Sequence, residues 1–441
     1  MSPWLLCDPP IGELMKMERS AQLKARLSIL GERVAKNEPV ITQLMTQALA
    51  RPKLLSLAAG FTDNTVLPAQ IVADSARQLL QDDPSQSYLQ YGVNQGRPRL
   101  REQVVERLAS YPGEGEIALG PKNVLISNGS QQSLYMSAQL FCDPGDIVLV
   151  EAPTYFVFLE LLKGLGLRPV SMPTTASGGI DIAGLETLFA DLKSKGDLDR
   201  VKLLYFMGVF ANPSARSWLE EDKCALGRFV GGLGWSLPVI EDVAYRDIYY
   251  DEPWPSRTVL SLPEWAGLPA MLAGTFTKPY ATGLKVGYAV SHDQDWIAHL
   301  ARIKGHHDFG TANYSQALIE EAISAGSFER HLITQRAHYA EKHAIFEAAL
   351  RSEGLQDLGW SWEAPVGGLL LWAKGPEGLD TSLDSEFWNA CLESDVTYVP
   401  GDLCFAQGEP RNFVRLSFGV LAPDALREAV RRFVAAARRF Q

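Results

Sequence analysis

The chain has 441 residues, of which 46% are hydrophobic and 21% are charged, with 41 lysines and arginines against 52 aspartates and glutamates. This is the composition of a globular protein that is long enough for two domains. Because the net charge is −11, the protein repels polyanions, and nucleic acid is not an expected partner.

The sequence contains no signal for a membrane or for export. Residues 1–10 (MSPWLLCDPP) lack the basic start and the long apolar run of a secretory leader. The longest apolar stretch, Leu203 to Ala211, is much shorter than the ~20 residues that a membrane helix needs. The five cysteines are scattered without zinc-site or disulfide spacing, and the seven histidines show no metal-ligand pattern. We therefore expect a cytoplasmic protein without a bound metal.

Strand-like and helix-like segments alternate through the middle of the chain. Apolar, β-branched or aromatic runs typical of strands lie near Ile126 and at 146–150, 201–206, 238–242, 270–276 and 285–291. Segments of helical length and composition lie between them, at Gln131–Phe141, Tyr155–Leu165 and Glu220–Gly231. Such alternation indicates βαβ units and predicts an α/β fold with a mostly parallel central sheet between helices.

The pattern changes after about Asn313. A long helical stretch, Ser327–Arg351, precedes strand-like runs at 367–373 and 412–418, which predicts a smaller α+β domain. His331, His338 and His343 are expected on the exposed side of this long helix. We expect residues 61–324 to form a large domain and 325–441 a small C-terminal domain, with 1–60 as an N-terminal segment that packs with the small domain.

A lysine follows one of the predicted strands. Gly274-Thr275-Phe276-Thr277-Lys278 closes the strand, and Thr282 to Tyr288 opens the next one. A single lysine in a turn is usually a solvated surface residue. Here two threonine hydroxyls and a second cation, Lys285, suit an anion such as a phosphate ester, and the amine of Lys278 can attack a carbonyl.

This segment resembles the lysine segment of the class I/II aminotransferases of fold type I, which depend on pyridoxal phosphate (PLP). In that family the segment has the sequence Ser-x-Ser-Lys, followed by Gly-Leu-Arg-x-Gly. Further segments resemble the family's motifs in their order along the chain. These are residues 89–102, Asn128-Gly129-Ser130-Gln131-Gln132, Glu151 to Tyr155, Asn212-Pro213, Glu241 to Tyr245, and Asn412 to Leu416. Within the family, the chain resembles the aminoadipate/kynurenine-like, broad-specificity branch.

The resemblance implies a role for each of these residues at the cofactor. Lys278 would carry PLP as a Schiff base and act as the general base, and Asp242 would keep the ring nitrogen protonated. Tyr245 and Asn212 would bind the phenolate oxygen, and Tyr155 would stack on the ring. The phosphate would lie at the helix that Ser130 and Gln131 begin, and its other expected ligands are Thr275, Thr277, Lys285 and Tyr91.

The resemblance also implies a substrate site and a partner. Arg415 and Gly60 would bind the amino acid or 2-oxo acid, with Arg415 holding its carboxylate. Tyr91 resembles a tyrosine that reaches the phosphate across a subunit boundary, so the site is expected to be shared in a homodimer.

Most of these residues also have a purely structural interpretation. Asp242 could cap a helix after its strand, and Ser130 could be a simple helix cap. Tyr155 could be a core aromatic residue, and Arg415 could form an internal salt bridge.

The chain departs from the family at two positions. Lys285 replaces the arginine that binds phosphate, which exchanges a bidentate fork for a point charge. Ser214-Ala215 stands where the family has Thr-Gly, and Ala215 would be strained if that position needs a positive φ.

The predicted function is transamination between an amino acid and a 2-oxo acid through Lys278. The alternatives are another PLP-dependent reaction at the α-carbon (a lyase, a decarboxylase or a carbon–carbon bond-forming enzyme) and a non-catalytic PLP-binding regulator. The roughly 45 residues before the fold are expected to be too few for a DNA-binding domain. A nicotinamide dehydrogenase would need a G-x-G-x-x-G after its first strand, which the sequence lacks. The sequence leaves the substrate side chain open.

Overall fold

The structure is a computed structural model, which describes residues 26–36, 39, 40, 42, 46, 51, 53–115, 117–175 and 178–441. Part of the expected N-terminal segment, Cys7 included, lies outside these residues. The described residues before position 38 and those from position 39 onward belong to two separate units. In the first unit, helix α1 (Ile29–Ala35) begins after Ser28, whose hydroxyl accepts from the N–H of Gly31. The expected domain boundaries at residues 60 and 324 stay a prediction.

A sheet of seven strands organises the region between residues 124 and 291. Its strand order is β2-β8-β7-β6-β5-β3-β4, and β8 runs antiparallel to both of its neighbours while the other pairs are parallel. The predicted mostly parallel sheet is therefore confirmed. Its strands are β2 (Val124–Ser127), β3 (Ile147–Val150), β4 (Arg168–Ser171), β5 (Val201–Met207), β6 (Val239–Asp242), β7 (Ala270–Thr275) and β8 (Gly287–Ser291).

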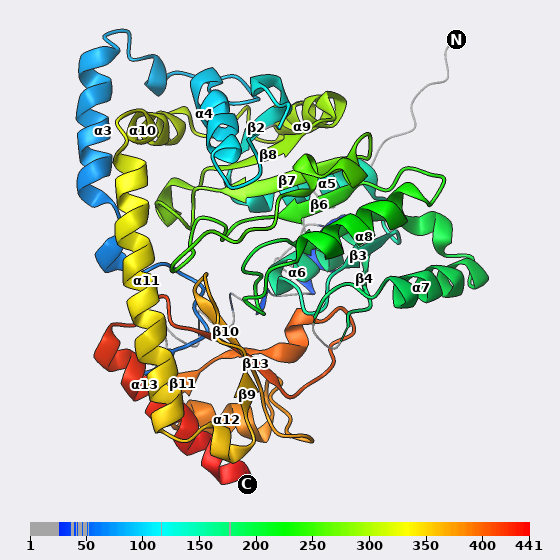
Figure 1. Ribbon diagram of the computed structural model, residues 1–441, viewed down its shortest axis with the longest axis vertical. Helices are drawn as coiled ribbons and strands as arrows, with labels where there is room; N and C mark the ends of the chain where they lie inside the picture. The colour runs from blue at the N-terminus through cyan, green and yellow to red at the C-terminus, as the bar shows by residue number, and fades with distance from the viewer. Residues whose placement is uncertain are drawn as a thin grey trace, which may run out of the picture. The chain divides into compact units, whose positions relative to one another are not determined.

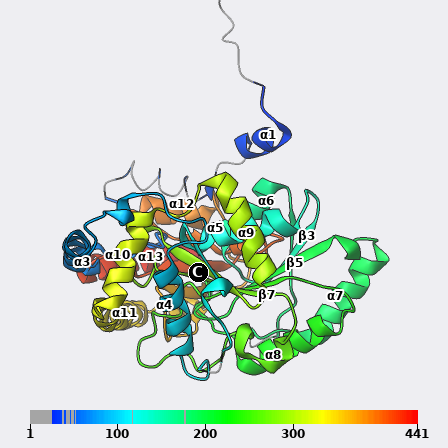
Figure 2. The same cartoon turned by 90° about the horizontal axis from the view of Figure 1, so that it is seen from above.

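Helices lie on both faces of this sheet. Figure 2 shows α5, α6 and α9 on one side and α8 on the other. Every residue of β2, β3, β6 and β7 is buried, because strands between two helical layers have no solvent face. The helices of this region are α3 (Ala69–Asp82), α4 (Pro98–Ala109), α5 (Gly129–Phe141), α6 (Phe156–Leu165), α7 (Ile182–Ser194), α8 (Glu220–Gly231), α9 (Gln294–His307) and α10 (Asn313–Ser324).

A second sheet, β12-β13-β10-β9, is antiparallel and lies at the lower end of Figure 1 with helices α12 and α13. It has its own hydrophobic core, to which Leu57 and Ala58 also belong because β1 pairs with β11. The strands of this sheet are β9 (Ser361–Trp362), β10 (Leu370–Lys374), β12 (Val399–Pro400) and β13 (Phe413–Ser417). Strands β1 (Leu55–Ser56) and β11 (Val396–Thr397) form a separate two-stranded parallel sheet. The helices of this region are α12 (Glu386–Glu393) and α13 (Pro423–Ala437).

Helix α11 (Ser327–Ser352) runs along both cores, as Figure 1 shows. Phe328 and Leu332 pack in the first core, and Phe346 and Leu350 pack in the second. Among the described residues, no helix combines the length and hydropathy needed to cross a bilayer.

The expectation that three histidines of this helix are exposed is wrong. His331 is 7% exposed, and His338 bonds to Asp63 at 3.0 Å. His343 stacks on the ring of Tyr250 with centroids 5.2 Å apart. A helix that packs against two cores buries more of its circumference than an ordinary surface helix, so its polar residues enter contacts.

Candidate active site

Lys278 lies in the turn after β7 and points to the segment that follows β1. Its Nζ donates a hydrogen bond to the carbonyl oxygen of Gly60 at 2.7 Å and lies 5.8 Å from the centroid of the Tyr245 ring. Burial, and then the charge of Arg415, lower the pKa of Lys278 from 10.5 to about 8. A much larger fraction of this amine is therefore neutral near pH 7 than of an exposed lysine, and a neutral amine can act as nucleophile or base.

Arg415 lies in β13 and is 2% exposed. Its two terminal nitrogens donate to the carbonyl oxygen of Ala58 at 2.5 Å and to Oδ1 of Asn212 at 3.1 Å, and its Nε has no partner. No carboxylate in the described part of the chain forms an ion pair with it, so those residues do not provide the internal salt bridge. A buried guanidinium without an anion is costly, and this one suits a carboxylate ligand.

Asp242 is the last residue of β6 and is 2% exposed. Its carboxylate accepts from Tyr205 Oη at 3.0 Å and from the N–H of Ala244 at 2.9 Å. Burial raises its pKa from 3.8 to about 6, and within the described ranges no cation pairs with it. The residues after β6 form a turn and not a helix. Asp242 therefore does not cap a helix, which was its purely structural interpretation.

Three further candidates surround these groups. Asn212 hydrogen-bonds to Tyr245, whose pKa burial raises to about 12. Tyr155 directly precedes α6, and burial raises its pKa, with the charge of Asp242 adding to the shift. The fold thus brings Lys278, Arg415 and Asp242 together with two tyrosines and an amide.

The phosphate candidates meet where α5 begins. Gly129 has φ +69°, and a Cβ on Gly287 would lie 2.5 Å from the backbone nitrogen of Ser130, so both positions need glycine. A Cβ on Gly129 would lie 3.6 Å from Oγ1 of Thr277, which accepts from Thr275 Oγ1 at 2.8 Å. The backbone N–H groups of residues 129–131 have no acceptor among the described residues. Unused N–H groups at a helix N-terminus can bind an anion.

Two predicted cofactor ligands form no side-chain hydrogen bond with the described residues of this cluster. Lys285 is exposed, and the side chain of Tyr91, 88% exposed, forms no bond to the other candidates in the described part of the chain. Gln131, a third predicted ligand, differs from these two residues, because its side-chain Oε1 is buried and has no hydrogen-bond partner in the described part of the chain.

Sequence reasoning missed two residues of the candidate site. Tyr205 lies in an apolar strand and carries no motif, yet it bonds to Asp242. Ala58 contributes only its backbone oxygen, which no side-chain pattern can indicate.

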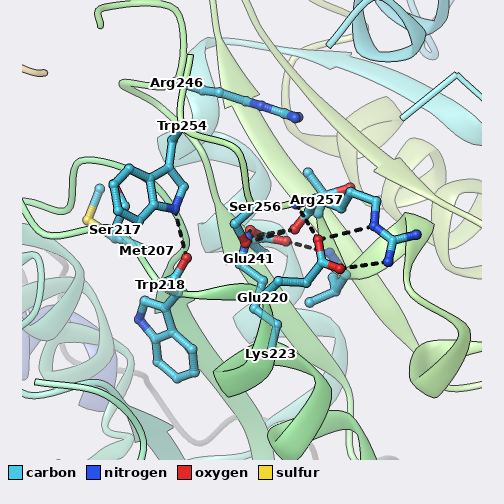
Figure 3. A network of polar contacts seen from close by, with 12 residues as sticks. Met207, Ser217, Trp218, Glu220, Lys223, Glu241, Arg246, Trp254, Ser256 and Arg257 are labelled. Carbon is cyan, nitrogen blue, oxygen red and sulfur yellow. Dashed lines mark hydrogen bonds and ion pairs between the residues drawn. The ribbon is translucent and has the colours of Figure 1, made fainter. Parts of the chain in front are cut away.

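Glu241, which precedes Asp242, anchors β6 on its other face. Glu241 pairs with Lys223 at 2.8 Å, with both side chains fully buried, and accepts from the N–H of Val259 at 2.8 Å. Figure 3 shows this network, including the fork of Arg257 on Glu220. The end of β6 is therefore held in place independently of Asp242.

Ala215 has the positive φ that would strain an alanine at this position. The turn after Asn212-Pro213 gives this alanine φ +56°, a conformation that is strained for a residue with a Cβ. Lys285 has φ +57°.

The chain matches known proteins over most of its length. The profile of the family described as Aminotransferase class I and II matches residues 52–433. The 2-aminoadipate transaminase of Thermus thermophilus is 33% identical over 384 residues, which cover 87% of this chain and 89% of that protein. Aromatic-amino-acid aminotransferase 1 of Thermococcus litoralis is 28% identical over 379 residues, covering 86% of this chain and 87% of that protein.

A solved structure agrees with these matches. The crystal structure of LysN, the α-aminoadipate aminotransferase of Thermus thermophilus complexed with N-(5′-phosphopyridoxyl)-L-leucine, aligns with a TM-score of 0.79 and 29% identity, covering 93% of this chain and 97% of that one. With a family match across most of the chain and this likeness of fold, the chain belongs to the class I and II aminotransferases and is a PLP-dependent enzyme of fold type I.

Proposed function

We propose that Lys278 binds PLP and moves the proton during amino-group transfer between an amino acid and a 2-oxo acid. One observation carries this proposal: two cations, the half-buried Lys278 and the buried Arg415, hydrogen-bond to a single backbone segment. The carbonyl oxygens of Gly60 and Ala58 accept hydrogen bonds from them. One cation is a depressed-pKa amine suited to chemistry, and the other is a permanent charge suited to holding a carboxylate.

The groups left without partners fit the charges of PLP. Asp242 would face the ring nitrogen, because a buried carboxylate without a cation favours a protonated pyridine. Tyr245 and Asn212 would bind the phenolate oxygen, and Tyr155 would cover a face of the ring. The phosphate would take the N–H groups at the start of α5, with the nearby hydroxyls of Thr275 and Thr277. When bound, PLP supplies an electron sink for the α-carbon of the substrate.

Lys278 and Arg415 have separate proposed roles in the reaction. In its neutral form, Nζ of Lys278 accepts the proton from the α-carbon of the substrate and later returns a proton to the product. Arg415 binds the α-carboxylate, which supplies the anion that its buried guanidinium lacks. Holding the carboxylate orients the α-proton toward Lys278.

We also propose a homodimer in which the partner completes the phosphate site. Five exposed apolar residues form the Tyr91 patch: Leu89, Tyr91, Val93, Phe309 and Tyr314. Their two loops lie side by side, because Asn313 bonds to the carbonyls of Ser87 and Gln90 and the rings of Tyr88 and Tyr314 are 6.0 Å apart. An exposed apolar patch of this kind favours a protein partner, and a second copy would bring Tyr91 to a neighbouring site.

Reductive labelling tests the assignment of the lysine. Borohydride treatment of the PLP-loaded protein should fix the cofactor to Lys278, and peptide mass mapping should find the label there. A label on Lys285, or on no residue, would contradict the proposal. Incubation with 2-oxoglutarate and a pool of amino acids that includes 2-aminoadipate and the aromatic amino acids, the substrates named for the two relatives, then identifies the substrate by product mass.

A further inference from the structure

A buried cluster of polar side chains joins the start of α5 to the end of α9. Lys304 of α9 has a fully buried side chain, and its Nζ donates to Oδ2 of Asp308 at 2.7 Å and to Oε1 of Gln132 at 2.7 Å. Gln132 Nε2 donates to the same Asp308 oxygen at 2.6 Å. The three side chains therefore form a closed triangle of hydrogen bonds.

This triangle holds the turn that precedes α5 at two points. The backbone N–H of Asn128 donates to Gln132 Oε1 at 2.8 Å, and its side-chain Nδ2 donates to Asp308 Oδ2 at 2.7 Å. Asn128 gives α5 no side-chain cap. Gln132 Oε1 accepts from the backbone N–H of Asn128 and from Lys304, and it takes none of the backbone N–H groups of residues 129–131. Those three N–H groups, which have no acceptor in the described part of the chain, therefore remain free for a ligand.

We propose that Lys304 and Asp308 are positioning residues for the cofactor phosphate, an inference that rests on the proposed role of the α5 turn. They act through Gln132 and Asn128 and fix the direction of the three free N–H groups. Lys304 also balances the carboxylate of Asp308, which would otherwise add a negative charge beside a dianionic ligand. A buried ion pair contributes little net stability, but it can fix geometry, which is the role proposed here.

Comparing PLP with pyridoxal, which lacks the phosphate, tests this role. Full-length protein freed of its cofactor is titrated with each compound, and the ratio of the two dissociation constants measures what the phosphate contributes. Lys304→Met should lower this preference for PLP by about fivefold or more and leave the affinity for pyridoxal unchanged. A loss of this size corresponds to at least one misaligned hydrogen bond to the phosphate.

Two further variants make the result interpretable. Lys195 forms an ion pair with Asp191 at 2.6 Å, which has the same i,i+4 spacing but is exposed. Lys195→Met should therefore leave the ratio unchanged. Asn128→Ala removes only the exposed bond to Asp308, so it should fold even if Lys304→Met does not, and it should lower the ratio in the same direction.

The outcomes separate the inference from the proposed function. If the unmodified protein prefers PLP and both Lys304→Met and Asn128→Ala keep that preference, the positioning role is overturned and the proposed function stands. If Lys304→Met weakens both compounds equally, its role is structural and the inference fails. If the unmodified protein binds PLP and pyridoxal equally well, the α5 turn is not the phosphate site, and the proposed function fails at that point.

Discussion

At the scale of single residues, the protonation of Asp242 affects the free energy of unfolding. Its pKa is raised by burial from 3.8 to about 6, so the folded chain holds this proton more tightly than the unfolded chain. The corresponding stability is fully present below the unfolded pKa and is lost as the pH rises through 6. In the cofactor-free protein, the stability advantage of Asp242→Asn should therefore grow by about 2 kcal/mol between about pH 4.5 and 8, measured by thermal unfolding.

Adding PLP should reverse this effect. With the pyridine nitrogen as its cation, the Asp242 carboxylate stabilises the folded protein, so Asp242→Asn should lower the Tm of the loaded form near pH 8. Glu151→Gln is the matched control, because Glu151 is also buried and burial raises its pKa to about 8. Among the described residues, Glu151 accepts hydrogen bonds only from the N–H of Met207 and from Nε1 of Trp218. Its effect on Tm should keep the same sign with and without PLP. An Asp242 variant that behaves like this control would exclude the proposed contact.

Arg415 should separate substrate binding from cofactor binding. Arg415→Ala should raise KM for both the amino acid and the oxo acid by roughly tenfold or more, the effect of losing about 1.5–3 kcal/mol in a charged hydrogen bond, while PLP affinity is retained. Steady-state kinetics for both half-reactions and a PLP titration measure the two effects. Arg411→Ala, at an exposed position just before β13, should change neither. A loss of PLP, with KM unchanged in the remaining active fraction, would contradict the role.

At the scale of elements, the turn after Asn212 carries measurable strain. An L-residue in the left-handed region costs about 1–2 kcal/mol, and glycine costs about 0.5–1 kcal/mol in the unfolded chain. Ala215→Gly should therefore raise stability slightly, by up to about 1 kcal/mol in chemical denaturation. Ala190→Gly in the exposed part of α7, where φ is negative, should lower it by about 0.5–1 kcal/mol. Equal losses for both variants would show that the strain at Ala215 is relieved in another way.

At the scale of the whole molecule, the Tyr91 patch should control assembly. Phe309 is 69% exposed, and Phe309→Glu places a charge in the proposed interface, so light scattering should show half the mass of the unmodified protein. PLP affinity should fall with it, because Tyr91 would arrive from the partner. Ile333→Glu, at a similarly exposed position on α11, should leave the mass unchanged. An unmodified protein that is already monomeric would refute the shared site.

The sequence by itself determined the local structure and the family. Apolar runs located the strands of both main sheets, apart from β4 and the shortest strands, and the predicted helix Glu220–Gly231 matches α8. This succeeded because hydrophobic periodicity and turn residues act over short distances along the chain. The motif around Lys278 was recognisable for the same reason, since its residues are neighbours in sequence.

The tertiary structure alone decided the surroundings of those residues. Gly60 and Lys278 are separated by 218 positions, and Ala58 and Arg415 by 357, so neither contact leaves a local pattern. Lys304 looks like an ordinary helix lysine, and His331 looks exposed, until packing buries both. The charge, burial and pKa of a side chain depend on groups that folding brings together, and only the folded chain shows which groups those are.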